Sequence, residues 1–174
     1  MAQDFLEQEI PLGIADPVAS GSLIRKKHYD EFVAPYAKRF VDGCNAVRPF
    51  GISCHICGNI TDILESVAAN GYINVDIDNT VDLAHAKKQI GKTVRISGNI
   101  NPAGVLLFGT PEEVREEVRA GFRIAWDSPC GYTVSTGCDS SWDTPLENSL
   151  AFMEEARKCA QYPLDPKNFS TDKD

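Results

Sequence analysis

Short apolar runs alternate along the chain with longer segments in which apolar residues recur every three or four positions. The short runs are bounded by Gly, Pro, Asn or Asp, which is typical of strands. They lie at 10–15, 50–55, 72–77, 93–97 and 132–136. Because a helical pattern follows each run, the alternation predicts parallel strands joined by right-handed helical crossovers.

The first two helical segments carry clear apolar stripes. We expect the first helix at about 27–46 and the second at about 59–70, with a short third helix after Val81. The stripe of the first consists of Phe32, Val33, Tyr36, Ala37, Phe40, Val41 and Cys44. The stripe of the second consists of Ile60, Ile63, Leu64 and Val67.

Two further helices begin with the same start signal, a Thr followed by Pro and, two residues later, by Glu. Thr110 opens one and Thr144 opens the other, and the spacing predicts a capping box at each start. The expected core positions are Val114, Val118 and Phe122 in the first, and Leu146, Leu150 and Met153 in the second.

Small and polar residues follow several strands, at the edge where parallel α/β folds build their sites. Both an open sheet and a (β/α) barrel fit this pattern, but a complete (β/α)8 barrel needs roughly 250 residues. The chain has 174. We therefore expect one α/β domain over 1–174, a partial TIM barrel made of its C-terminal half, with about five parallel strands and five helices. A polar tail at 163–174 is expected to fray.

Charge and composition limit which kinds of binding partner and which cellular compartment are expected. The net charge of −8 and the absence of basic runs argue against nucleic acid. No apolar stretch reaches the roughly 20 residues that span a bilayer, so no membrane segment is expected. The acidic N-terminus lacks a signal-peptide pattern, which predicts a cytoplasmic protein. In the cytoplasm, the six cysteines are more consistent with free thiols or metal ligands than with disulfides.

The pair His55 and Cys57 is the main chemical signal. Alternate residues of a strand share a face, so the two side chains are expected to point the same way. Cys138 follows the last strand at the same rim, and His-Cys-Cys with an open fourth position is the ligand pattern of a catalytic zinc. Asp76 and Asp78 are the nearby carboxylates, and Asp78, closer to the rim, is the preferred exchangeable fourth ligand.

A plainer interpretation is that His55 and Cys57 are packing residues at a strand end, because buried free cysteine is common. Cys138 at a matching rim favours the ligand interpretation. Asp16, Asn99 and Asn101 are candidate substrate contacts, although turn chemistry explains them equally well. The remaining cysteines are expected to be core or remote: Cys44, Cys54, Cys130 and Cys159.

Seven motifs occur in an order that resembles the C-terminal half of the uroporphyrinogen decarboxylase superfamily, over roughly 10–160. They are Asp16-Pro-Val-Ala-Ser-Gly-Ser-Leu-Ile24, His55-Ile-Cys-Gly-Asn59, Val81-Asp-Leu83, Gly98-Asn-Ile-Asn-Pro102, Gly109-Thr-Pro-Glu-Glu-Val114, Ser135-Thr-Gly-Cys138 and Asp143-Thr-Pro-Leu-Glu-Asn148. Within the superfamily, His-x-Cys-Gly with a later rim Cys is similar to the cobalamin-dependent methyltransferases, of the methylcobalamin:coenzyme M type.

That resemblance implies Zn²⁺ held by His55, Cys57 and Cys138, with a carboxylate such as Asp78 in the fourth position. It also implies methyl transfer from a methylated corrinoid, carried by a corrinoid protein, to a small thiol such as coenzyme M or toward tetrahydrofolate. Members of the family carry a complete barrel, and the N-terminal half has no counterpart in this chain. We therefore expect either a homo-oligomer or a missing N-terminal half as partner.

Two other functions remain open from the sequence. One is uroporphyrinogen decarboxylase, a metal-free reaction against which the His-Cys-Cys set counts. The other is a non-catalytic half-barrel fragment that pairs with another chain. Metal content separates the methyltransferase from the decarboxylase, and activity of the isolated chain separates it from the fragment.

Overall fold

The computed structural model describes residues 12–47, 49 and 51–170. Five strands form one parallel sheet in the order β1-β2-β3-β4-β5, which is also their order along the chain. Their bounds are β1 Leu12–Ala15, β2 Ile52–Ile56, β3 Asn74–Ile77, β4 Arg95–Ile100 and β5 Tyr132–Thr136. The predicted strand positions at 10, 11 and 50 lie outside the described residues.

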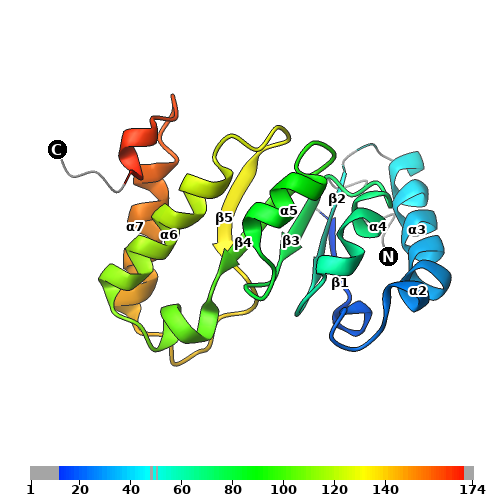
Figure 1. Cartoon of the computed structure of the whole chain (residues 1–174), viewed down its shortest axis with the longest axis horizontal. Helices are drawn as coiled ribbons and strands as arrows, with labels where there is room; N and C mark the ends of the chain where they lie inside the picture. The colour runs from blue at the N-terminus through cyan, green and yellow to red at the C-terminus, as the bar shows by residue number, and fades with distance from the viewer. Residues whose placement is uncertain (1–11, 48, 50, 171–174) are drawn as a thin grey trace.

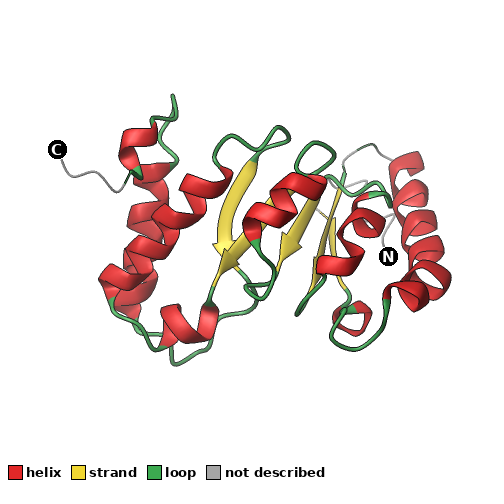
Figure 2. Cartoon of the chain, viewed as in Figure 1, coloured by secondary structure: helices red, strands yellow, loops and turns green. Residues whose placement is uncertain are grey.

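Helices connect each strand to the next, and α7 follows the last strand, β5 (Figures 1 and 2). The α-helices are α2 Lys26–His28, α3 Ala34–Val47, α4 Leu64–Ala68, α5 Leu83–Ile90, α6 Pro111–Ala125 and α7 Leu146–Cys159. The other helical turns are η1 Pro17–Ala19, η2 Tyr29–Val33, η3 Thr61–Ile63, η4 Pro102–Leu107 and η5 Pro166–Asn168. The predicted first helix is thus α2, η2 and α3 run together, and the predicted second is η3 and α4.

The strand order decides between the two predicted architectures. A doubly wound open sheet reverses its strand order at a switch point, whereas this sheet never does. Right-handed crossovers that always move in one direction keep their helices on one face, as in a barrel. The expectation of a partial (β/α)8 barrel is therefore confirmed.

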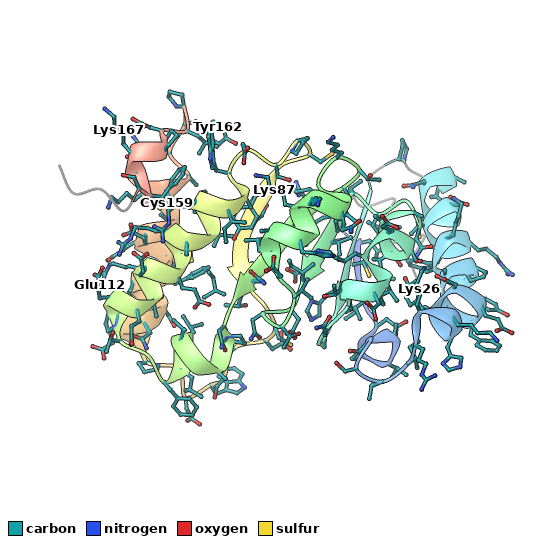
Figure 3. All side chains as sticks on the ribbon, in the orientation of Figure 1. Lys26, Lys87, Glu112, Cys159, Tyr162 and Lys167 are labelled. Atoms are coloured by element: carbon teal, nitrogen blue, oxygen red, sulfur yellow. The ribbon has the colours of Figure 1, made fainter. Side chains whose placement is uncertain are left out.

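The helix-facing side of the sheet is the core. In β2 the buried residues are Ile52, Cys54 and Ile56, which alternate with half-buried Ser53 and His55. Cys44 and Cys159 are buried on their helices as predicted, and so are the residues expected to line the second helix. Lys87 of α5 donates to the carbonyl of Ile124 and pairs with Asp127, which holds α5 against α6 (Figure 3).

The capping prediction is right at α6 and wrong at α7. Thr110 Oγ1 accepts from the Glu113 backbone N–H at 3.3 Å, and Glu113 Oε2 accepts from the Thr110 N–H at 2.7 Å. At α7 the N-cap is Pro145, and the Thr144 hydroxyl makes no hydrogen bond within the described part of the chain. No capping box forms there.

The expected core stripe of α7 is also wrong. Leu146, Leu150 and Met153 are 73%, 51% and 44% exposed. Asn148 instead faces inward, because its amide donates to the carbonyls of Leu106 at 2.9 Å and Gly109 at 2.8 Å. The amide thus satisfies two carbonyls of the η4–α6 turn, while the apolar stripe is left exposed within the described part of the chain.

The tail is ordered further than expected. Phe169 is buried, and its ring stacks on Phe122 with centroids 5.6 Å apart. Cys159 at the end of α7 lies beside this terminal turn, which also carries Lys167 (Figure 3). The tail therefore packs against the end of α7 as far as it is described. No helix among the described residues is long and apolar enough to cross a membrane.

Both ends of the sheet are open in the described chain, where β1 pairs only with β2 and β5 only with β4. Apolar side chains gather at both ends. Phe32 and Tyr36 are 62% and 68% exposed beside β1, and the α7 stripe is exposed beyond β5. Open edges and uncovered apolar surface favour association.

We expect the isolated chain to self-associate at micromolar concentration for this reason. Leu150→Lys should weaken the association, because it places a charge in the α7 stripe, without lowering the melting temperature. Sedimentation velocity measures the association. Ile124→Lys, at an apolar position on α6 outside the stripe, is the control. A monomer at all concentrations would contradict the expectation.

Candidate metal centre

The rim position of His55 follows from strand alternation. β2 buries Cys54 under the helices and turns His55 to the opposite, open face. That face has a hollow of about 350 Å³. Most of the residues that line it are polar, and they are Ser53, His55, Asn74, Asp76, Arg95, Ser97, Thr133 and Ser135, with Gly13, Ile14 and Cys54 beside them. The predicted division between Cys54 and His55 is therefore confirmed.

Three donor atoms converge where β2 and β5 end. Cys57 Sγ lies 3.2 Å from His55 Nε2 and 3.7 Å from Cys138 Sγ. All three donor atoms lie within 4.8 Å of one another, and within the described ranges no other group of three or more such ligands occurs. The structure thus brings together the three side chains that the sequence selects, from positions 81 residues apart.

Two glycines make this convergence sterically possible. Gly58, directly after Cys57, has a φ of +74°, a value that side-chain-bearing residues rarely adopt. Gly137, directly before Cys138, lies so close to Asn79 that an added Cβ would come within 2.4 Å of the Asn79 backbone nitrogen. The close approach of Gly137 lets the loop after β5 reach the end of β2.

His55 is held from its other nitrogen. Its Nδ1 lies 3.1 Å from the backbone oxygen of Asp76 and 3.4 Å from the Asp76 carboxylate. The Asp76 side chain raises the pKa of His55 to about 10, against the opposing effect of burial, and contacts with Cys138 and Cys57 add to the rise. Nδ1 is thereby directed to Asp76, and Nε2 is left facing the two sulfurs.

Asp78, the predicted fourth ligand, is not part of this group. Its Oδ2 accepts from the Gly58 N–H at 2.8 Å, and its Oδ1 accepts from the Thr80 N–H and hydroxyl at 2.9 Å each. Burial alone would raise the pKa of Asp78, but these hydrogen bonds hold it below the usual value. Asp78 pins the loop that follows Cys57, and a ligand role for it stays a prediction.

The predicted substrate contacts all have structural hydrogen bonds. Asp16 Oδ1 accepts from the Ala19 N–H as the cap of η1. Asn101 Oδ1 accepts from two N–H groups at the start of η4. The Asn99 amide donates to the carbonyls of Asp78 and Val81. In the structure these three side chains stabilise turns and helix starts. Their contact with a substrate stays a prediction.

Sequence reasoning missed the role of Asp76 as the partner of His55. Ser97 and Ser135 also donate to Asp76 Oδ1, at 2.9 and 3.1 Å. The signal that could have found this partner is strand register, because His55, Asp76 and Ser97 are aligned residues of neighbouring strands. Register between strands far apart in sequence cannot be derived from one strand alone.

The donor set suits a thiophilic divalent metal. Two Zn–S bonds of about 2.3 Å at the tetrahedral angle hold their sulfurs about 3.8 Å apart. Cys57 and Cys138 already stand 3.7 Å apart, with the imidazole nitrogen of His55 beside them. Three protein ligands leave a fourth position for an exchangeable group, which is the pattern of catalytic rather than structural zinc.

Several proteins of known activity are similar to this chain. It is 32% identical over 146 residues to the methylcobamide:CoM methyltransferase MtbA of Methanosarcina acetivorans, covering 84% of this chain and 41% of that protein. It is 31% identical over 135 residues to the uroporphyrinogen decarboxylase of a Picosynechococcus species, covering 77% of this chain and 37% of that protein. The chain thus spans about two fifths of the length of these relatives.

A solved structure agrees with the fold. A methyltransferase from Methanosarcina mazei superposes with a TM-score of 0.77 at 27% identity, over 90% of this chain and 44% of that one. The family model for uroporphyrinogen decarboxylase (URO-D) matches residues 11–159. With that match over most of its length, the chain belongs to the uroporphyrinogen decarboxylase family.

Proposed function

We propose that this chain is the zinc-binding part of a methyltransferase that moves a methyl group from a methylated corrinoid to a small thiol. The convergence of His55, Cys57 and Cys138 at the carboxyl rim is the observation that carries the proposal. Relatives named as methylcobamide:CoM and methylated-thiol–coenzyme M methyltransferases support the same reaction class.

The three side chains would hold Zn²⁺, Cys57 and Cys138 as thiolates and His55 through Nε2. When bound there, the ion lowers the pKa of a substrate thiol and holds it as thiolate near neutral pH. The thiol proton goes to solvent. Of the three ligands, His55 also lines the hollow on the open face, so a substrate thiol bound in that hollow would lie next to the proposed ion.

The transfer itself balances without an external oxidant or reductant. The thiolate sulfur would attack the methyl carbon, so that an S–C bond forms as the Co–C bond breaks. The electron pair of the Co–C bond would stay with the corrinoid substrate, which would leave in the Co(I) state. The products are a thioether and a corrinoid ready for remethylation. A corrinoid protein is therefore the proposed partner. The proposed methyl acceptor is a small thiol such as coenzyme M, or the methyl group is passed on toward tetrahydrofolate.

Uroporphyrinogen decarboxylase is the alternative, because named decarboxylases match the chain nearly as well. That reaction has no use for two cysteines and a histidine at one rim. The three converging donors favour the methyltransferase, and the other segments of the barrel, which this chain does not contain, are proposed to come from a complementary part.

We expect purified chain to bind about one zinc ion. Cys57→Ala should lose most of the metal, because it removes one of three protein ligands. Cys130→Ala, which removes an exposed cysteine outside the group, should keep it. Cys54→Ala, one residue from His55 and three from Cys57 but on the helix face, should also keep it. Elemental analysis after gel filtration measures the content.

Equal metal loss in Cys57→Ala and Cys54→Ala, with both variants folded by circular dichroism, would remove the strand-face argument. Absence of zinc in the unaltered chain would remove the proposed metal centre.

Methyl transfer from free methylcobalamin to a small thiol should depend on the metal and on Cys138. The isolated chain should be slow, because orientation of the reacting groups contributes roughly 7–11 kcal/mol and part of the surrounding wall is absent from this chain. Corrinoid absorbance follows the loss of the methyl–cobalt species, with and without chelator.

Cys138→Ala should abolish this transfer, and Cys130→Ala should leave it unchanged. A complementary barrel segment added in trans should raise the rate without raising the zinc content. Chelator-insensitive turnover would remove zinc from the reaction, and carbon dioxide released from uroporphyrinogen would favour the decarboxylase.

A further inference from the structure

The carboxylate of Asp76, on β3, receives contacts from three other strands, of which β2 and β4 are its direct neighbours. His55 Nδ1 of β2 lies 3.4 Å from its Oδ2. Ser97 of β4 and Ser135 of β5 donate their hydroxyl protons to its Oδ1, at 2.9 and 3.1 Å. The two carboxylate oxygens therefore have different partners: Oδ2 lies near the imidazole, and Oδ1 accepts from the two serines.

The strand register produces this arrangement. His55 pairs with Asp76, and Asp76 pairs with Ser97, so the three residues stand at one level across β2, β3 and β4. Their side chains share the open face of the sheet, which carries the hollow. Ser135 of β5 pairs with Asn99, two residues closer to the carboxyl end of the sheet than Ser97.

Asn74 and Arg95, which pair two residues before Asp76 and Ser97, orient the Ser97 hydroxyl. Arg95 Nε donates to Asn74 Oδ1 at 3.2 Å, and the Asn74 amide donates to Ser97 Oγ at 2.8 Å. The Ser97 hydroxyl, which accepts from Asn74, then gives its own proton to Asp76. Donation runs in one direction from a guanidinium to a carboxylate, and hydrogen bonds in such a chain strengthen one another.

We infer that Asp76 is a positioning residue that fixes the imidazole of His55 with Nε2 aimed at Cys57 and Cys138. The inference rests on the proposed function for its use, because the ring orientation matters for holding a metal. Carboxylate partners of metal-binding histidines act in this way, by fixing the ring and its tautomer, and their removal typically weakens metal binding about 10–100-fold.

One competing explanation involves the same residue. The backbone oxygen of Asp76 lies 3.1 Å from His55 Nδ1, closer than the carboxylate. If that oxygen alone held the ring, removal of the side chain would change nothing at His55. The side chain differs from the backbone in its negative charge and in its ties to Ser97 and Ser135, so substitution of Asp76 separates the two.

The test compares Asp76→Ala and Asp76→Asn with Asp127→Asn. The last variant makes the same change in charge at a surface residue paired with Lys87, away from the network. Zinc affinity is measured by competition with a chelator. The Nδ1–H proton of His55 is observed by NMR in the metal-free, ¹⁵N-labelled chain, where Nδ1 carries this proton because its neighbours are acceptors.

We expect Asp76→Ala to bind zinc about 10–100-fold more weakly, and its Nδ1–H proton to exchange faster with water. Asp76→Asn, which keeps the shape but not the charge, should fall between it and the unaltered chain, and it also serves if the alanine variant does not fold. Asp127→Asn should match the unaltered chain in both measurements.

The inference would be overturned if both Asp76 variants kept their zinc affinity, their Nδ1–H exchange rate and a native circular dichroism spectrum. That result would mean that the backbone oxygen of Asp76 alone orients the His55 ring. The NMR measurement needs no zinc. A chain that binds no zinc, yet loses Nδ1–H protection on substitution of Asp76, would remove the proposed function and leave the positioning role supported.

Discussion

The register between β2, β3 and β4 is the constraint on which the candidate site depends. It aligns His55 with Asp76 and Asp76 with Ser97, so that an imidazole, a carboxylate and a hydroxyl meet on the open face. A slip of one residue in β2 would bring Cys54 to this face and bury His55 among the helices. The buried residues Ile52, Cys54 and Ile56 oppose that slip, because it would expose them to water.

Local pattern was enough for the strands and for the main donors. Five apolar runs correspond to the five strands, and the alternation of β2 separates His55 from Cys54. The capping box at Thr110 also depends only on neighbours in sequence. Cys138 could be assigned to the same rim because parallel strands end at one edge.

The failures concern contacts between distant segments. The orientation of α7 is set by Asn148, whose amide reaches two carbonyls about 40 residues away in sequence. No helical periodicity contains that information. Phe169 is similar, because a single aromatic residue in a polar tail packs only where Phe122 happens to lie. The η4 turn, Pro102–Leu107, was also missed, and it follows a strand with its start capped by Asn101.

The distribution of exposed surface is relevant to the proposed complementary part of the barrel. The open face of the sheet is polar, and its Asn74, Arg95 and Ser97 satisfy one another by hydrogen bonds, so water on that face costs little. Exposed apolar side chains lie at the two ends of the sheet, on α3 and η2 beside β1 and on α7 beyond β5, while others, such as Phe108 and Trp142, lie in the loops after η4 and β5. A parallel sheet is stable when neighbours cover it. Closure from the two ends would bury Phe32, Tyr36 and the α7 stripe, while the hollow in front of His55 would become the barrel interior, reached from the rim where the three donors lie.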